Sequence, residues 1–424
     1  MSTNSRVALN GLKVISFFIL SLLYCFVSTV GLELYVFLSI CYFILLLLVG
    51  LLNDFRKSTC LFNAFFLVFV VGGSIFHFSV RGFDETIAFF IASFFALLNF
   101  SNYLFGIKLS NVNSVEQTDW KSRRTIILNA SCYFFIILGI LFAVLFYLKI
   151  GYIPLLSGAS PKERIEAMQG NGFYLQMLRF SIYASMIVYL VTKKRVSLIL
   201  FALTELLLLG VGFRGTVAQN IIIFLISVFF VKGKALTWKY AVVWSLLGII
   251  FIMIVANARG EIGDLTIAYS LLHTLSVSVS NFAFIYTHFN DFQYGGTFFY
   301  NFMMFVPGPN IDYTQWLAQQ VPINFEGGIT PTILGDLYVN FGLFFVAFSV
   351  PISILLYGID KELILSKYSS LNPVKVLLIV NISVLLSRSI TGGFSNQSLN
   401  IVLTTVFLSA MLVVSKLKIK SRVS

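Results

Sequence analysis

The sequence is poor in charge and in residues that hold metal ions or form disulfides. Only 11% of its 424 residues are charged, three are histidine and four are cysteine. The cysteines lie in or beside apolar stretches, without metal-ligand spacing, at Cys25, Cys41, Cys60 and Cys132. We interpret them as buried thiols and expect no disulfide framework.

Motifs that bind nucleotides or metals are also missing. The sequence has no P-loop, no glycine-rich dinucleotide motif and no cluster of histidine, cysteine and carboxylate residues. We therefore expect neither a cofactor nor a metal ion. Any energy that a reaction requires must arrive with the substrate.

Apolar residues dominate what the chain does contain. They make up 58% of the sequence, and the mean hydropathy is +0.92. A soluble domain cannot bury so much apolar surface, so we predict an all-α polytopic integral membrane protein, with one transmembrane domain over residues 1–424. A spanning helix needs about 20 mostly apolar residues, and about twelve such stretches are present. They lie near 12–30, 34–52, 61–80, 86–107, 126–148, 173–192, 196–211, 216–231, 240–257, 332–357, 374–390 and 398–415.

The lysines and arginines predict the orientation of these spans. Of the 29, the loops and termini on one side receive 21, and this excess marks the cytoplasmic side. The net charge of +12 is thereby explained by topology, without nucleic acid. Both termini are expected in the cytoplasm. The other eight residues lie on the outer side or at its helix ends, at Arg81, Lys149, Lys162, Arg164, Arg179, Arg214, Arg259 and Arg388.

Two outward loops follow from this topology. Residues 149–172 are expected to form a loop with a short interfacial helix, because Ser160, Pro161 and Glu163 match a helix start. Residues 258–331 are expected to form a large loop with further interfacial helices. Since this loop is the longest interruption of the apolar sequence, we look for function beside it.

Arginines placed on the outer side against the charge bias are the first functional candidates. If they converge on one cavity, their guanidinium groups suit phosphate oxygens. Arg214 follows a glycine-containing turn at a helix start, which favours an anion site, although an arginine reaching the lipid headgroups is the alternative. Arg259 precedes two carboxylates, so a salt-bridged helix start is its alternative. The candidates are Arg164, Arg179, Arg214, Arg259 and Arg388.

Aromatic residues of the large loop are candidates to stack on sugar rings. They also match the aromatic belt at a membrane interface, and the sequence does not separate the two interpretations. The histidines His77, His273 and His288 are more typical of structural polar residues. The aromatic candidates include Tyr300, Tyr313 and Trp316.

Three segments together resemble a known family. They are the Gly-Phe-Arg-Gly stretch at 212–215, the span exit that contains Arg259, and the stretch 332–342, which reads Thr-Ile-Leu-Gly-Asp-Leu-Tyr-Val-Asn-Phe-Gly. With the loop around Arg164, they resemble the bacterial oligosaccharide repeat-unit (O-antigen, Wzy-type) polymerases. The resemblance in span number and loop layout extends over nearly the whole chain.

The resemblance implies a metal-independent glycosyltransferase of the lipid-linked, multi-span (GT-C-like) architecture. Its donor would be a growing glycan on undecaprenyl diphosphate, and its acceptor a repeat unit on a second such lipid. It would act on the periplasmic face of the bacterial inner membrane, with a chain-length regulator and a repeat-unit flippase as partners.

The resemblance also implies roles for residues. Arg214 and Arg259 would bind the diphosphate, with Arg164, Arg179 and Arg388 in support. Tyr338 of the third segment would join the glycan-binding aromatics. The candidates for a base that assists the attacking hydroxyl group are Glu261, Asp264, His273 and Asp336.

Two alternative functions remain open at this point. An O-antigen ligase uses the same donor with a lipid A-core acceptor, and His273 or His288 would supply the loop histidine expected of ligases. A flippase for lipid-linked oligosaccharides fits twelve spans, and Glu205 is a carboxylate within a span. A flippase usually has two repeat-related halves, which the sequence does not show.

Overall fold

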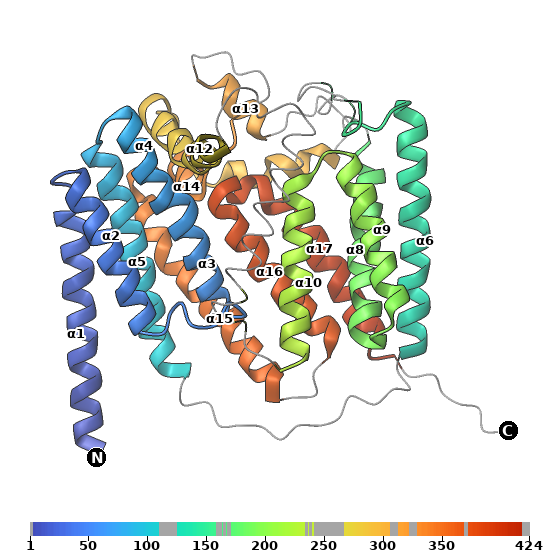
Figure 1. Ribbon diagram of the computed structural model, residues 1–424, viewed down its shortest axis with the longest axis horizontal. Coiled ribbons are helices and arrows are strands. Elements are labelled where there is room, and N and C mark those ends of the chain that lie inside the picture. The colour runs from blue at the N-terminus through green and yellow to red at the C-terminus, as the bar shows by residue number, and fades with distance from the viewer. Residues whose placement is uncertain are drawn as a thin grey trace. The chain divides into compact units, whose positions relative to one another are not determined.

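The computed structural model describes most of the chain as helices (Figure 1). The described residues are 3–109, 125–157, 163, 167, 171–233, 236, 240, 267–305, 313–321, 329–368 and 372–417. Within these ranges the elements are helices joined by turns and irregular segments, without a β-strand. Apolar runs of this length form helices because lipid offers no hydrogen-bond partner to the backbone, whereas a helix pairs its own N–H and C=O groups.

The chain divides into two compact units. Unit 1 comprises residues 1–114, 268–362 and 386–399, and unit 2 comprises residues 115–267, 363–385 and 400–424. Each unit is therefore built from segments that are distant in the sequence.

The first half of unit 1 is a set of N-terminal helices. A π-helical turn, η1, joins α3 and α4 into one continuous helix, and phenylalanines of α3 and α5 stack, with the rings of Phe66 and Phe95 4.7 Å apart. The elements are α1 (Thr3–Val27), α2 (Leu32–Leu48), α3 (Ser58–Phe66), η1 (Leu67–Gly72), α4 (Gly73–Arg81) and α5 (Glu85–Leu109).

The second half of unit 1 includes the segment predicted as a large outward loop. That segment contains a 22-residue helix, α12, and two shorter helices. The elements are α12 (Ile267–His288), η3 (Gly296–Phe305), α13 (Tyr313–Gln319), α14 (Ile333–Phe341), η4 (Gly342–Phe348) and most of α15 (Ser349–Tyr368). The end of α16 and the start of α17 complete the unit.

Unit 2 is a bundle in which α6, α8, α9 and α10 run alongside one another (Figure 1). Gly139 of α6 allows the close approach of α8, because a Cβ atom there would lie 2.6 Å from the Ser181 Oγ and 2.7 Å from the Met177 carbonyl oxygen. Small residues serve this purpose at helix interfaces in membranes. The helices are α6 (Thr125–Ile150), α8 (Gly172–Thr192), α9 (Arg195–Gly210), α10 (Arg214–Val231), and parts of α16 (Pro373–Gly392) and α17 (Phe394–Val414).

The membrane prediction is confirmed in its general form. Seven helical stretches among the described residues are long and apolar enough to cross a membrane, and three apolar helices are shorter. Every predicted span coincides with a helix except 240–257, which lies outside the described residues apart from Tyr240. The protein is an all-α polytopic membrane protein. The count of about twelve spans and the GT-C-like architecture are not confirmed and stay predictions.

We expect Gly139→Val to destabilise unit 2 by about 1–3 kcal/mol, because the added methyl groups force α6 away from α8. The measurement is the thermal unfolding temperature of the detergent-purified protein. Gly106→Val on α5 is the control, since a Cβ atom at Gly106 would have no neighbouring atom within 4 Å. Equal unfolding temperatures for the two variants would contradict the close α6–α8 packing.

Candidate functional site

Several of the predicted site residues cannot be placed by the structure. Arg164, Arg259, Glu261 and Asp264 lie outside the described residues. Two further candidates are described by their backbone alone, Arg214 as the first residue of α10 and His273 within α12. Arg388 lies near the end of α16 in unit 1 and is half-buried. The described side chains fall into two groups, one in each unit.

The group in unit 2 is built on the turn between α9 and α10. The Gly210 carbonyl oxygen accepts a hydrogen bond from the Leu155 backbone amide at 3.0 Å. Gly212 then takes a φ of 98°, in the left-handed region that favours glycine. The turn thereby directs Phe213 into a small apolar core around Phe146 and Leu175. This core holds the α10 start, with Arg214, against α6 and α8.

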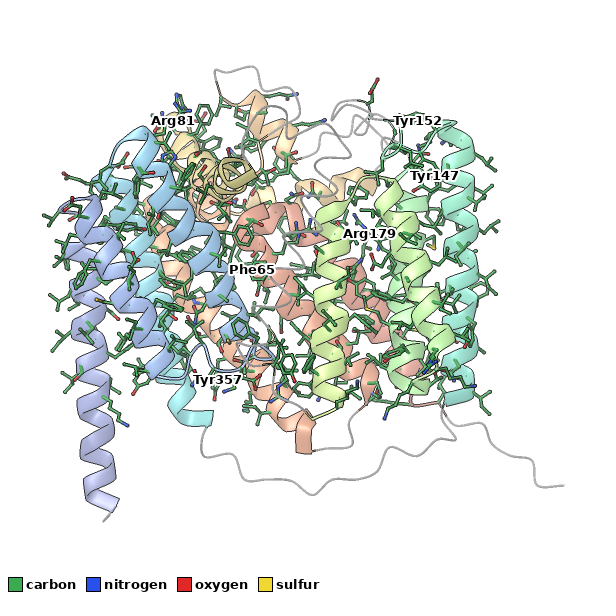
Figure 2. All side chains as sticks on the ribbon, viewed as in Figure 1. Phe65, Arg81, Tyr147, Tyr152, Arg179 and Tyr357 are labelled. Atoms are coloured by element: carbon green, nitrogen blue, oxygen red, sulfur yellow. The ribbon has the colours of Figure 1, made fainter. Side chains whose placement is uncertain are left out.

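Arg179 of α8 lies against the same turn. Its guanidinium carbon is 5.6 Å from the centre of the Phe213 ring, and its Nη1 donates a hydrogen bond to the Asn400 side-chain oxygen of α17. Figure 2 shows Arg179 in the same half of unit 2 as Tyr147 and Tyr152, and deeper along the helices. Arg179 thus contacts the residue that immediately precedes Arg214. Two of the predicted diphosphate-binding arginines belong to one local structure.

The group in unit 1 surrounds Asp336, whose side chain is completely buried. The Ser395 backbone amide donates to Asp336 Oδ2 at 2.7 Å, and the Ser395 hydroxyl group donates to Oδ1 at 2.7 Å. The Tyr313 hydroxyl group also donates to Oδ1, at 2.9 Å. Hydrogen bonds to its charged form stabilise a buried carboxylate. Asp336 therefore joins α13, α14 and the start of α17.

Neighbouring polar residues extend this network. Asn340, one helical turn after Asp336, donates to the Thr297 hydroxyl oxygen at 2.6 Å and accepts from the Gly295 amide at 3.0 Å. Asn301 donates to the Ser395 carbonyl oxygen at 3.0 Å. Asp336 and Asn340 thus place η3 against α14 and α17. Both belong to the segment 332–342 that carries the strongest resemblance in the sequence.

Three of the four aromatic candidates lie together beside this network. The Trp316 ring is 4.8 Å from the Tyr300 ring and 5.8 Å from the Tyr313 ring. Tyr300 and Trp316 are half-buried, whereas Tyr313 is fully buried. The fourth, Tyr338, lies elsewhere, against Tyr286 at 5.2 Å. We call Tyr300, Tyr313 and Trp316 the aromatic cluster.

Tyr313 links the aromatic cluster to Asp336. Burial first, and the Asp336 carboxylate second, raise the pKa of Tyr313 well above its usual value. The hydroxyl group therefore stays protonated and keeps donating its hydrogen bond. Asp336 sets the position of the Tyr313 ring, and this ring stacks on Trp316 with an angle of 19° between the planes.

A comparison with protein families identifies the chain. The model of a family described as "Putative O-antigen polymerase" matches residues 13–392. The chain belongs to the O-antigen polymerase family. The family predicted from the sequence is thereby confirmed. No curated protein and no solved structure matches the chain.

The sequence of this O-antigen polymerase family member did not reveal every residue of the two groups. Asp336 accepts hydrogen bonds from Ser395 and Thr297, and Asn301 donates to Ser395. These partners come from distant segments, and no sequence motif linked them to Asp336. Gln176, one turn before Arg179, was also missed. The one available signal was the presence of amide and hydroxyl side chains within apolar stretches, where polar groups need a partner.

We expect Asp336→Asn to change the surroundings of the aromatic cluster. An asparagine NH2 group in the place of Oδ2 would face the Ser395 backbone amide, donor against donor, and in the place of Oδ1 it would remove the acceptor of the Tyr313 hydroxyl group, at a cost of about 1–3 kcal/mol. The measurement is acrylamide quenching of Trp316 fluorescence, with Trp120, Trp238 and Trp244 replaced by phenylalanine. Quenching should increase.

Asp360→Asn is the matched control for this experiment. Asp360 is also buried in unit 1 and accepts four hydrogen bonds, from Ser58 and Thr59. Its loss should destabilise the protein without affecting Trp316 quenching. Equal quenching in both variants would refute the link from Asp336 through Tyr313 to Trp316.

Proposed function

We propose that the protein polymerises undecaprenyl-diphosphate-linked oligosaccharide repeat units into an O-antigen-type polysaccharide. A hydroxyl oxygen of the incoming repeat unit forms a bond to the anomeric carbon of the donor glycan. The bond from that carbon to the diphosphate oxygen breaks, and undecaprenyl diphosphate leaves with the electron pair. The hydroxyl proton passes to a base. Membership of the O-antigen polymerase family supports this general activity.

The observation that carries the diphosphate-binding part of the proposal is the contact between Arg179 and the turn before Arg214. Guanidinium groups stabilise developing negative charge on phosphate oxygens. The α10 start adds backbone N–H groups that point out of the helix end. We assign the diphosphate to Arg214 and Arg259, supported by Arg164, Arg179 and Arg388. In this scheme the arginines act without a metal ion.

The burial of Asp336 argues for a positioning role rather than that of the base. Both carboxylate oxygens accept hydrogen bonds from the protein, and the side chain has no exposed surface. A base must reach the proton that it accepts. Glu261, Asp264 and His273 remain our candidates for the base.

The aromatic cluster is our proposed sugar-binding surface. Tyr300 and Trp316 keep part of their surface accessible, and both rings are held by Tyr313. Tyr338 is 6% exposed and packs among other aromatic rings, so we give it a supporting role. A sugar ring presents C–H groups that pack on an aromatic face.

The proposed activity requires a particular location in the cell. We place the protein in the bacterial inner membrane with about twelve spans, cytoplasmic termini and a periplasmic active site. The substrates are lipid-linked oligosaccharides, and the proposed partners are a chain-length regulator and a repeat-unit flippase.

Purified protein in proteoliposomes, supplied with synthetic undecaprenyl-diphosphate repeat units, should produce a ladder of polymer lengths. The reaction should proceed in EDTA and without nucleotide, because the donor carries its own leaving group. Electrophoresis of the labelled glycans measures the ladder. Translocation of the lipid without polymer formation would instead indicate a flippase.

Arg214→Ala should lower the polymerisation rate by at least about 100-fold, since it removes charge stabilisation of the leaving group. Arg81→Ala is the control, because Arg81 is an exposed arginine at the end of α4 in unit 1. Protein level and unfolding temperature should match the wild type in both variants. A normal ladder from Arg214→Ala would remove this residue from the diphosphate site.

A further inference from the structure

Two nitrogen donors of α8 are buried without a hydrogen-bond acceptor in the described part of the chain. They are the Nε2 atom of Gln176 and the Nε atom of Arg179. Gln176 is 9% exposed and precedes Arg179 by three residues, so the two side chains lie on one face of the helix. A buried donor without an acceptor is costly, and a hydrocarbon surrounding offers no water to replace the acceptor.

The charge of Arg179 also has no counter-ion among the residues that the structure describes. The acceptor provided by the protein is the neutral Asn400 side-chain oxygen, and the Phe213 ring covers the guanidinium group. Among the described residues, the salt bridge found joins Arg56 and Asp54, and no carboxylate lies within 4.0 Å of Arg179. A charged residue within a span normally pairs with another group or faces a ligand pathway. Arg179 therefore has the properties of an anion-binding residue in its ligand-free state.

Other polar groups near this part of α8 already have partners. The Tyr183 hydroxyl group donates to Asn381, whose amide donates in turn to Thr404. Lys149 donates to the Asn171 side-chain oxygen at 2.8 Å. The unsatisfied donors are thus confined to Gln176 and Arg179 among these residues. The helix rises about 1.5 Å per residue, so Arg179 lies about 10 Å along α8 from its start at Gly172.

We propose that Gln176 and Arg179 form a donor pair that binds the phosphoryl oxygens of a polyprenyl-linked diphosphate, with Gln176 as a further binding residue. This inference rests on the proposed function and names a residue that contacts its leaving group. One phosphoryl oxygen accepts from Gln176 Nε2 and another from Arg179 Nε. Asn400 holds the far side of the guanidinium group. A lipid phosphate suits the position of the pair within a span, where the polyprenyl chain remains in the bilayer.

Ligand binding to the full-length protein in detergent tests the pair. The probes are farnesyl diphosphate and inorganic diphosphate, measured by isothermal titration calorimetry. Gln176→Leu should weaken farnesyl diphosphate binding roughly tenfold or more, because it removes a hydrogen bond to a charged acceptor. Gln176→Glu should weaken it further, since a carboxylate repels the phosphate. Ser185→Ala is the control on the same helix, because its hydroxyl group bonds within α8.

A second measurement separates ligand binding from a structural role. Without ligand, Gln176→Leu should keep or raise the unfolding temperature, since it removes a donor that has no partner. A structural role predicts a lower unfolding temperature and unchanged affinity, and this result would overturn the inference. Equal binding of inorganic and farnesyl diphosphate would assign the pair to free anions and would also overturn the lipid assignment.

The inference and the proposed function fail in different ways. If Arg214→Ala abolishes the polymer ladder while Gln176→Leu binds farnesyl diphosphate as the wild type does, the donor pair is refuted and the polymerase stands. If Gln176→Leu loses affinity for farnesyl diphosphate and the wild type makes no ladder, the donor pair is supported and the polymerase is refuted.

Discussion

The burial of the Asp336 carboxylate, without a cation beside it among the described residues, is the constraint on which unit 1 depends. Asp336 accepts hydrogen bonds from the amide and hydroxyl group of Ser395 and from the hydroxyl group of Tyr313, and these donors come from two separate segments. Burying any one of these polar groups in an apolar surrounding without a hydrogen-bond partner would cost free energy. The segments must therefore come together for the network to be satisfied. Gly393 completes this arrangement, because its φ of 75° suits glycine and a Cβ atom there would lie 3.2 Å from the Asp336 side chain.

Unit 2 presents the opposite situation, because the half-buried cation Arg179 has no anionic partner among the described residues. The protein satisfies the Asp336 oxygens but leaves Arg179 Nε and Gln176 Nε2 without acceptors. A fully satisfied network stabilises a fold, whereas an incomplete one costs stability until a ligand completes it. Binding sites commonly carry such a cost, since the groups that recognise a ligand are unpaired in its absence. This contrast is the reason why we propose a supporting role for Asp336 and a ligand-binding role for Arg179.

The helices were predictable from the sequence because apolar runs of this length have one stable backbone conformation in a membrane. The segment 332–342 could be found as a motif, and Arg179 and Arg214 as charges placed against the topological bias, but their proximity along α8 and α10 could not. The partners of Asp336 were not. Ser395 lies 59 residues from Asp336, and only tertiary packing brings them together. The serines and histidines of α12 lower its apolar character, so the sequence did not distinguish this 22-residue helix within the segment expected as a loop with interfacial helices.

The role of Asp336 bears on where the reaction proton goes. Both oxygens of the Asp336 carboxylate already accept hydrogen bonds from protein groups. It also lacks an exposed surface, so a sugar hydroxyl group would have to displace Tyr313 or Ser395 to reach it. Such displacement would break the network that holds η3 and α13. Asp336 is therefore poorly placed to accept the reaction proton, which is why we propose Glu261, Asp264 or His273 for that role.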